Sequence, residues 1–289
     1  MHGPASAGRT VALMNQKGGV GKTTTTVNLG AALAEAERRV CLIDLDPQAH
    51  LTLHLGIDAG DGPTTYDLLT DPDCTAARCL ITARPHLSVI PSEVDLAAAE
   101  TDLAGVPDRQ RILRHKLEQI VDSFDFILID CPPSLGLLTL NALAAAREVL
   151  VPMQAHFLAL QGVGKLLETV GLVCASVNPS LRVTGILLCM HEGQTTLARE
   201  VVADIEAFFE DAADRELPWG GCRVLKPPIR RNVKLAEAPS FGQTIFDYAQ
   251  WCAGANDYRK LAEALLEVWD TPTQSVEAKP LETVTMREG

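Results

Sequence analysis

Short, nearly continuous runs of apolar residues alternate along the chain with longer stretches in which apolar positions recur every three or four residues. The short runs are typical of parallel strands covered by helices on both faces, and the longer stretches have helical periodicity. This alternation predicts an α/β fold, a single doubly wound domain with a mostly parallel central sheet flanked by helices. The expected strands are residues 11–14, 40–44, 87–91, 126–130, 149–152 and 183–190. The expected helices are residues 23–37, 109–121, 137–146, 158–175, 197–209 and 255–268.

Composition adds three expectations about organisation. No Gly-, Ser- or Pro-rich linker divides residues 1–270, so they are expected to form one domain, whereas the polar segment 271–289 is expected to be a disordered tail. No stretch reaches the roughly 20 uninterrupted apolar residues of a membrane span. Eight scattered cysteines without a C-x-x-C pair indicate small core residues in a reducing cytoplasm rather than disulfides or a metal site.

The most specific motif is N-Q-K-G-G-V-G-K-T-T-T-T, residues 15–26, which lies between the first strand and the first helix. Its three glycines allow the backbone to curl so that successive N–H groups point at a polyphosphate, and the positive end of the helix faces the same anion. Lys22 would neutralise the terminal phosphates, and the hydroxyl of Thr23 would hold Mg²⁺. The motif therefore predicts a site for a nucleoside triphosphate and Mg²⁺.

A second lysine stands inside this loop. The standard phosphate-loop pattern has glycine where this chain has Gln16, and Lys17 follows it directly. A solvated loop charge is the simplest interpretation of Lys17. In a loop of such restricted composition we instead expect Lys17 to reach an anion.

Carboxylates follow two of the expected strands. Asp44 and Asp46 stand two residues apart at the end of strand 40–44, and this spacing predicts that both point into the crevice where α/β sheets bind ligands. Asp130 ends the apolar strand 126–130, and phosphate loops pair with an aspartate of this kind to hold Mg²⁺. The residues Pro132 and Pro133 then fix the loop behind this aspartate.

In combination these motifs resemble the ParA-type ATPases, the deviant Walker A group of the MinD/ParA superfamily, over residues 9–266. The resemblance implies that Lys17 crosses to the nucleotide of a second subunit in an ATP-bound homodimer. It assigns the water-orienting role to Asp46, with Asp44 supporting the Mg²⁺ and its water shell. Segment 230–245 resembles a late family segment in which Asn232 would lie beside the adenine, although Arg230 replaces the usual proline. The implied nucleotide-binding residues are Lys17, Gly18, Gly19, Val20, Gly21, Lys22, Thr23, Thr24 and Asn232; the implied metal site is Thr23, Asp130 and Asp44; the implied catalytic residues are Asp46, Lys17 and Lys22.

Charge gives a mixed indication about nucleic acid. The net charge of −12 argues against general nucleic-acid binding, but segment 223–234 carries basic residues and no acidic one. Such a segment is compatible with a solvated loop and with a surface for an anionic polymer. Gln194 stands where the family often has a DNA-contacting arginine. The candidate contacts to non-specific double-stranded DNA are Arg231, Lys234, Arg230 and Lys226.

The resemblance therefore implies a cytoplasmic, nucleoid-associated, Mg²⁺-dependent ATPase that acts as a dimerisation switch in chromosome or plasmid partitioning, activated by a ParB-like protein. An orphan relative that positions another cargo is the main alternative. A membrane-cycling MinD-like ATPase needs an amphipathic C-terminal helix, for which segment 277–289 has no apolar face. An ATP-using ligase would leave segment 230–245 unexplained, and an iron–sulfur reductase lacks a convincing cysteine set. Segment 210–229 is longer than in the family, and Gly162–Lys165 is interpreted as close helix packing rather than a second phosphate loop.

Overall fold

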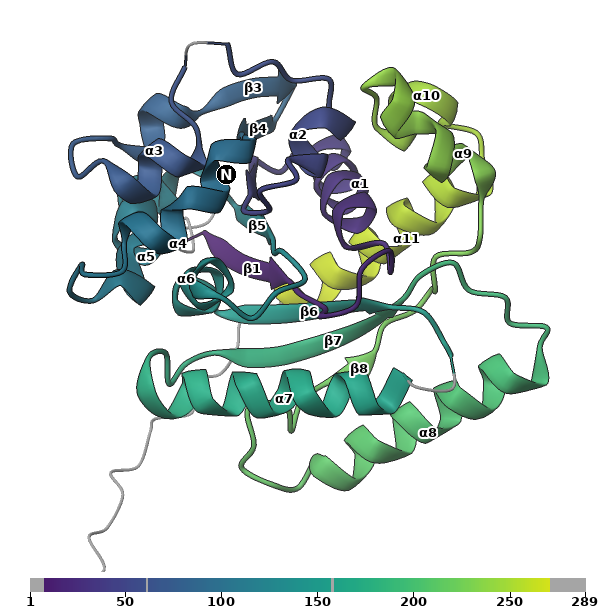
Figure 1. Cartoon of the computed structure of the whole chain (residues 1–289). Coiled ribbons are helices and arrows are strands. Elements are labelled where there is room, and N and C mark those ends of the chain that lie inside the picture. The colour runs from purple at the N-terminus through teal and green to yellow at the C-terminus, as the bar shows by residue number, and fades with distance from the viewer. Residues whose placement is uncertain (1–7, 61, 157–158, 271–289) are drawn as a thin grey trace, which may run out of the picture.

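The computed structural model describes residues 8–60, 62–156 and 159–270. Its strands form one sheet in the order β3-β4-β2-β5-β1-β6-β7-β8, which runs through the middle of the molecule with helices on both faces (Figure 1). The pairing of β3 with β4 is antiparallel, and the other neighbouring pairs are parallel. The strands are β1 Arg9–Leu13, β2 Val40–Asp44, β3 Ile81–Arg84, β4 Leu87–Ile90, β5 Phe126–Asp130, β6 Glu148–Met153, β7 Arg182–Leu188 and β8 Arg223–Val224.

Two hydrophobic cores lie on opposite faces of this sheet, because successive residues of a strand point to opposite sides. In β1, Val11 and Leu13 pack into the core shared with α1 and α11, whereas Ala12 packs into the core shared with α6, α7 and α8. The central strands β2 and β5 are buried along their whole length, which explains their continuous apolar sequences. The helices are α1 Lys22–Glu35, α2 His50–His54, α3 Thr65–Thr70, α4 Ala99–Asp102, α5 Ile112–Leu117, α6 Leu137–Ala145, α7 Ala159–Ser176, α8 Thr196–Ala212, α9 Val233–Glu237, α10 Ile245–Ala249 and α11 Ala253–Trp269.

The predicted fold class is confirmed, and strands 40–44 and 126–130 have the predicted bounds. The predicted helix 109–121 is wrong in extent, because α5 spans only Ile112–Leu117 between single helical turns. The side chain of Asn141 in α6 explains the interruption. Its Oδ1 accepts from Leu113 N at 3.0 Å and its Nδ2 donates to Arg109 O at 2.9 Å, so it stands between two groups that an α-helix would bond to each other.

Two further expectations are settled by the fold. Gly162 and Gly164 lie inside α7, which excludes a second phosphate loop. Close packing does not explain them, because a Cβ at either position would meet no heavy atom of the described residues within 4 Å. Segment 210–229 completes the sheet, because it contains the end strand β8, which pairs in parallel with β7. Over the residues that the structure describes, no helix is both long enough and apolar enough to span a membrane. The predicted tail, residues 271–289, and the predicted helix start at residue 158 lie outside the described residues.

Candidate nucleotide-binding site

The loop between β1 and α1 forms a glycine-lined turn at the carboxyl edge of the sheet. Gly19 and Gly21 have φ of 71° and 94°, a left-handed conformation that residues with a Cβ rarely adopt. The loop is tied to the end of β6 from both sides: Asn15 Nδ2 donates to Pro152 O at 2.8 Å, and Gln154 Nε2 donates to Gly19 O at 3.1 Å. The backbone cradle for a phosphate is thus held in shape by neighbouring side chains.

The two lysines of the loop have different environments. Lys22, the first residue of α1, is 8% exposed, and its Nζ lies 3.5 Å from Lys17 O. Lys17 is exposed, together with Gly18 and Gly19, while its backbone N–H is fixed by Asn15 Oδ1 at 3.0 Å. One cation therefore points into the cradle and the other is available at the surface.

Thr23 and Asp130 are brought together beneath the loop, as the sequence predicts. Thr23 Oγ1 donates to Asp130 Oδ2 at 2.6 Å, and Thr26 Oγ1 donates to Asp130 Oδ1 at 3.0 Å. Asp130 is also the register partner of Asp44 in the neighbouring strand β2. Burial, and after it the negative charge of Asp44, raise the pKa of Asp130 to about 7.

This donor set fits Mg²⁺. A hydroxyl and a carboxylate are the hard oxygen donors that the ion prefers, and Mg²⁺ is usually held by one or two protein ligands together with phosphates and waters. Two adjacent buried carboxylates also create a negative potential that a cation would offset. Thr23 and Asp130 are the residues that could hold the ion.

Asp44 and Asp46 occupy different positions. Asp44 is fully buried, and its Oδ2 accepts from Thr52 N at 2.9 Å and from Thr52 Oγ1 at 2.8 Å. Burial raises the pKa of Asp44 to about 6. β2 ends at Asp44, so the alternation of a strand does not extend to Asp46, which begins a turn and accepts from Gln48 N through its Oδ1 at 2.9 Å.

A cavity of about 390 Å³ adjoins the loop on the side of α9. Asn232 lines it, and the Oδ1 of this residue caps α9 by accepting from Lys234 N at 2.9 Å. Gly21 and Thr24 also line it, so Asn232 shares a cavity with the phosphate loop and the start of α1, and its contact with adenine stays a prediction. The other lining residues are Cys189, Met190, Ile229, Arg230, Arg231, Val233, Leu235, Ala236 and Tyr258.

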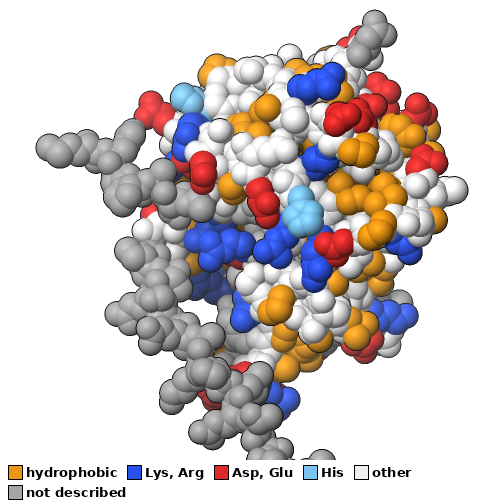
Figure 2. Space-filling view, turned by 90° about the vertical axis from the view of Figure 1, so that its left-hand side faces the viewer, with side chains coloured by type: hydrophobic (Ala, Val, Ile, Leu, Met, Phe, Trp, Pro, Cys, Tyr) orange, Lys and Arg blue, Asp and Glu red, His pale blue; other side chains and the backbone are white. Residues whose placement is uncertain are grey.

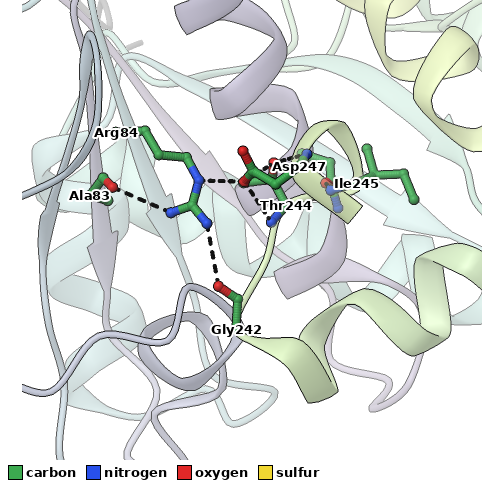
Figure 3. A network of polar contacts seen from close by, with 7 residues as sticks. Ala83, Arg84, Gly242, Thr244, Ile245 and Asp247 are labelled. Carbon is green, nitrogen blue, oxygen red and sulfur yellow. Dashed lines mark hydrogen bonds and ion pairs between the residues drawn. The ribbon is translucent and has the colours of Figure 1, made fainter. Parts of the chain in front are cut away.

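The segment behind this cavity is fastened to the phosphate-loop helix and to β3. Ile245 N donates to Asn28 Oδ1 of α1 at 2.8 Å. Arg84 of β3 donates to the carboxylate of Asp247 and, at 3.3 Å, to Gly242 O (Figure 3). This segment contains two short helices, α9 and α10, each with a side-chain cap at its start.

Each cation proposed for DNA is paired with a carboxylate. Arg231 Nε lies 2.9 Å from Glu192, while Arg230 makes several bonds to Asp257, of which the shortest ion pair is 2.6 Å. Similarly, Lys234 Nζ lies 2.8 Å from Glu237, and Lys226 Nζ lies 3.3 Å from Glu206. The composition of segment 223–234 does not predict these ion pairs, because the acidic partners lie outside the segment.

Basic side chains also gather elsewhere on the surface. Figure 2 shows the side of the molecule on which α3 and α5 lie, with Lys and Arg side chains across the middle of the face among acidic and apolar ones. On α5, Arg114 and His115 are exposed. Basic charge is therefore not confined to segment 223–234.

The glycine cradle, the buried Lys22 and the pair Thr23–Asp130, at the carboxyl edge of a parallel sheet, define a phosphate-loop nucleoside triphosphatase. The family model described as "AAA domain" matches residues 8–183. The chain is 43% identical over 259 residues to the chromosome-partitioning ATPase Soj of Treponema pallidum, covering 90% of this chain and 97% of that protein. It is 45% identical to the Soj of Thermus thermophilus, covering 89% and 95%.

A solved structure of cobyrinic acid a,c-diamide synthase from Mycobacterium smegmatis, with bound ADP and magnesium, has a TM-score of 0.75 and 38% identity, covering 91% of this chain and 96% of that one. The chain belongs to the ParA/Soj family of chromosome-partitioning ATPases.

Proposed function

We propose that this protein hydrolyses ATP to ADP and phosphate in a Mg²⁺-dependent way and uses the nucleotide to switch between monomer and dimer during chromosome or plasmid partitioning. The observation that carries the proposal is the contrast between the two lysines of one loop. Lys22 is buried against the cradle, whereas Lys17 is exposed on a backbone that hydrogen bonds hold in place.

Within one subunit, the loop N–H groups and Lys22 bind the triphosphate, while Asn232 contacts the base from the adjoining cavity. Mg²⁺ held by Thr23 and Asp130 would supply positive charge to the phosphate oxygens. Asp46 orients the attacking water. It begins the turn after β2, at the same edge of the sheet as the phosphate loop.

Between subunits, Lys17 of each copy reaches the phosphates of the other. A lysine–phosphate contact is a charge-assisted interaction that exists only while the phosphate is present, so nucleotide binding favours the dimer. Loss of the terminal phosphate removes this contact and favours dissociation. Slow turnover in isolation, accelerated by a ParB-like activator, follows the behaviour of other nucleotide switches.

We further propose that the dimer binds double-stranded DNA without sequence preference through Arg231, Lys234, Arg230 and Lys226. Dimerisation doubles the number of cations that one DNA molecule can contact. Because Glu192 pairs with Arg231 and Glu237 pairs with Lys234, DNA phosphates must compete with protein carboxylates. The expected binding is weak and strongly salt-dependent.

The likeness to the diamide synthase of Mycobacterium smegmatis suggests a second candidate function, that of an amide-forming ligase. An ATP turnover assay separates the two. The switch should release phosphate in the presence of only ATP, Mg²⁺ and water, and EDTA should abolish the reaction. A strict requirement for a carboxylic acid and an amine donor would contradict the switch and favour the ligase.

An orphan relative that moves another cargo would show the same ATP turnover as a partition protein. An adjacent ParB-like gene would distinguish the partition protein from the orphan relative.

A further inference from the structure

Two buried hydroxyl residues connect Asp44 with the backbone of Asp46. Thr52 of α2 donates to Asp44 Oδ2 through both its N–H and its hydroxyl. The hydroxyl oxygen of Thr52 in turn accepts from Ser92 N at 3.0 Å, and Ser92 Oγ donates to Asp46 O at 2.9 Å. The exposed fractions of Thr52 and Ser92 are 4% and 1%, so water has little access to these bonds.

The turn that this network holds is strained. Ala49, three residues after Asp46, has φ 51° and ψ 30°, a left-handed conformation that costs a residue with a Cβ about 1–2 kcal/mol. Asp46 closes the turn twice, because its O accepts from Ala49 N at 2.9 Å and its Oδ1 accepts from Gln48 N. A strained turn persists only where its surroundings fix it, and the bond from Ser92 is one that comes from another part of the chain.

We propose that Ser92 is a positioning residue for ATP hydrolysis: its hydroxyl fixes the main chain of Asp46 and thereby the place of the Asp46 carboxylate relative to the phosphate loop. Thr52 links the same hydrogen-bond network to Asp44. Ser92 follows β4, at the neighbouring strand end, and is not among the residues that the sequence motifs indicate. The inference rests on the proposed function, because it assigns Ser92 a part in the hydrolysis that Asp46 supports.

The Ser92→Ala variant tests this relationship selectively. It removes the hydroxyl bond to Asp46 O but keeps the backbone bond from Ser92 N to Thr52 Oγ1. We expect kcat to fall roughly 10- to 100-fold, because small misplacements of a reacting group have effects of that size. We expect KM, the Kd for a fluorescent ATP analogue and the melting temperature to stay near the wild-type values, since the phosphate cradle is not altered.

Two comparisons make the result decisive. Ser176→Ala is the matched control, because Ser176 Oγ also donates to a backbone carbonyl, Leu172 O at 2.7 Å, but on α7; it should retain the wild-type kcat. In an Asp46→Ala background, Ser92→Ala should cause no further loss in single-turnover rate, because the residue acts through Asp46.

Three patterns of result are distinguishable. A wild-type kcat in Ser92→Ala, while wild-type protein hydrolyses ATP, would overturn this inference and leave the proposed function intact. A loss of kcat accompanied by an equal loss of nucleotide affinity or of thermal stability would also overturn it, since that pattern indicates a general structural role. Wild-type protein that binds but never hydrolyses ATP would overturn the proposed function itself and this inference with it.

Discussion

Thr23 Oγ1 donates a hydrogen bond of 2.6 Å to Asp130 Oδ2, joining the first turn of α1 to the end of β5. The two residues lie 107 positions apart in the sequence, and the parallel pairing of β1 with β5 brings them together. The hydroxyl and the carboxylate are thus already adjacent where Mg²⁺ would bind. From this relationship we expect that the metal and the nucleotide bind in a coupled way.

Asp130→Asn should therefore weaken binding of ATP in the presence of Mg²⁺ by about tenfold or more, while binding of ATP in EDTA stays close to that of wild type. The amide keeps the size of the side chain but removes the anionic ligand that Mg²⁺ prefers. Titration of a fluorescent ATP analogue under both conditions measures the two affinities. Equal losses with and without Mg²⁺ would show that Asp130 supports the fold of the site rather than the metal.

Lys22→Ala should abolish nucleotide binding, because it removes the buried cation of the cradle. Lys165→Ala provides a control, since Lys165 follows a similar Gly-x-Gly sequence inside α7 and is exposed there. Isothermal titration with ATP and Mg²⁺ should detect binding by wild type and by Lys165→Ala. Wild-type affinity in Lys22→Ala would refute the assignment of the phosphate loop.

Glu192→Gln should strengthen DNA binding, because it releases Arg231 from its ion pair without removing a cation. Gln194→Arg should act in the same direction by adding a cation, and the Arg231→Ala, Lys234→Ala double variant should bind much more weakly. Each DNA phosphate that a variant no longer neutralises reduces the salt slope by about 0.9 in log–log terms. Filter binding at several salt concentrations, with a non-hydrolysable ATP analogue, measures affinity and slope.

Arg114→Ala is the control for this prediction, since Arg114 is an exposed cation on α5, outside the proposed DNA surface. Loss of DNA binding in Arg114→Ala, with none in the double variant, would move the DNA surface to the face shown in Figure 2. Absence of binding by every variant at low salt would remove DNA from the mechanism.

His54 predicts a pH dependence of stability. Burial, together with the nearby charge of Arg84, lowers the pKa of this histidine from its usual 6.5 to about 4. Between these two pKa values the unfolded chain binds a proton at His54 that the folded chain does not. The contribution of His54 to the free energy of unfolding is therefore complete above about pH 6.5 and is lost as the pH falls toward 4. The titration of His54 changes the free energy of unfolding by at most about 1.4 kcal/mol per pH unit.

The comparison that isolates His54 is the free energy of unfolding in urea at pH 7.5 and pH 5 for wild type and His54→Gln. We expect wild type to lose more stability than the variant between these two values, because glutamine does not titrate. An equal loss in both proteins would mean that His54 titrates alike in the folded and unfolded chains.

The sequence predicts those features that depend on residues close together in the chain. Strands 40–44 and 126–130 were recognisable because burial on both faces imposes an unbroken apolar run. The phosphate loop was recognisable because its left-handed turns require glycine at positions 19 and 21. Contacts between segments that are distant in the sequence could not be recognised from the sequence. Asn141 interrupts the helix predicted for 109–121, and the acids that pair with Arg231, Arg230 and Lys226 become neighbours of these cations only in the folded chain.

The hydrogen-bond network around Asp46 shows the same limit. Asp46 was identified from its spacing to Asp44, but Ser92, which bonds its carbonyl, lies 46 residues further along the chain. Serine after a strand is common, so no pattern distinguishes it. A comparable argument applies to Gly242, whose role as an acceptor for Arg84 depends on the packing of β3 against the segment before α10.

In the proposed switch Lys17 and Asp46 have separate roles, one across the subunit boundary and one in hydrolysis. Size-exclusion chromatography with light scattering, at saturating ATP and Mg²⁺, distinguishes these roles. Asp46→Ala should bind ATP and accumulate as a dimer, because the terminal phosphate is retained. Lys17→Ala should bind ATP and remain a monomer, as should the double variant. An Asp46→Ala protein that stays monomeric with ATP bound, or a Lys17→Ala protein that dimerises like Asp46→Ala, would rule out this division of roles.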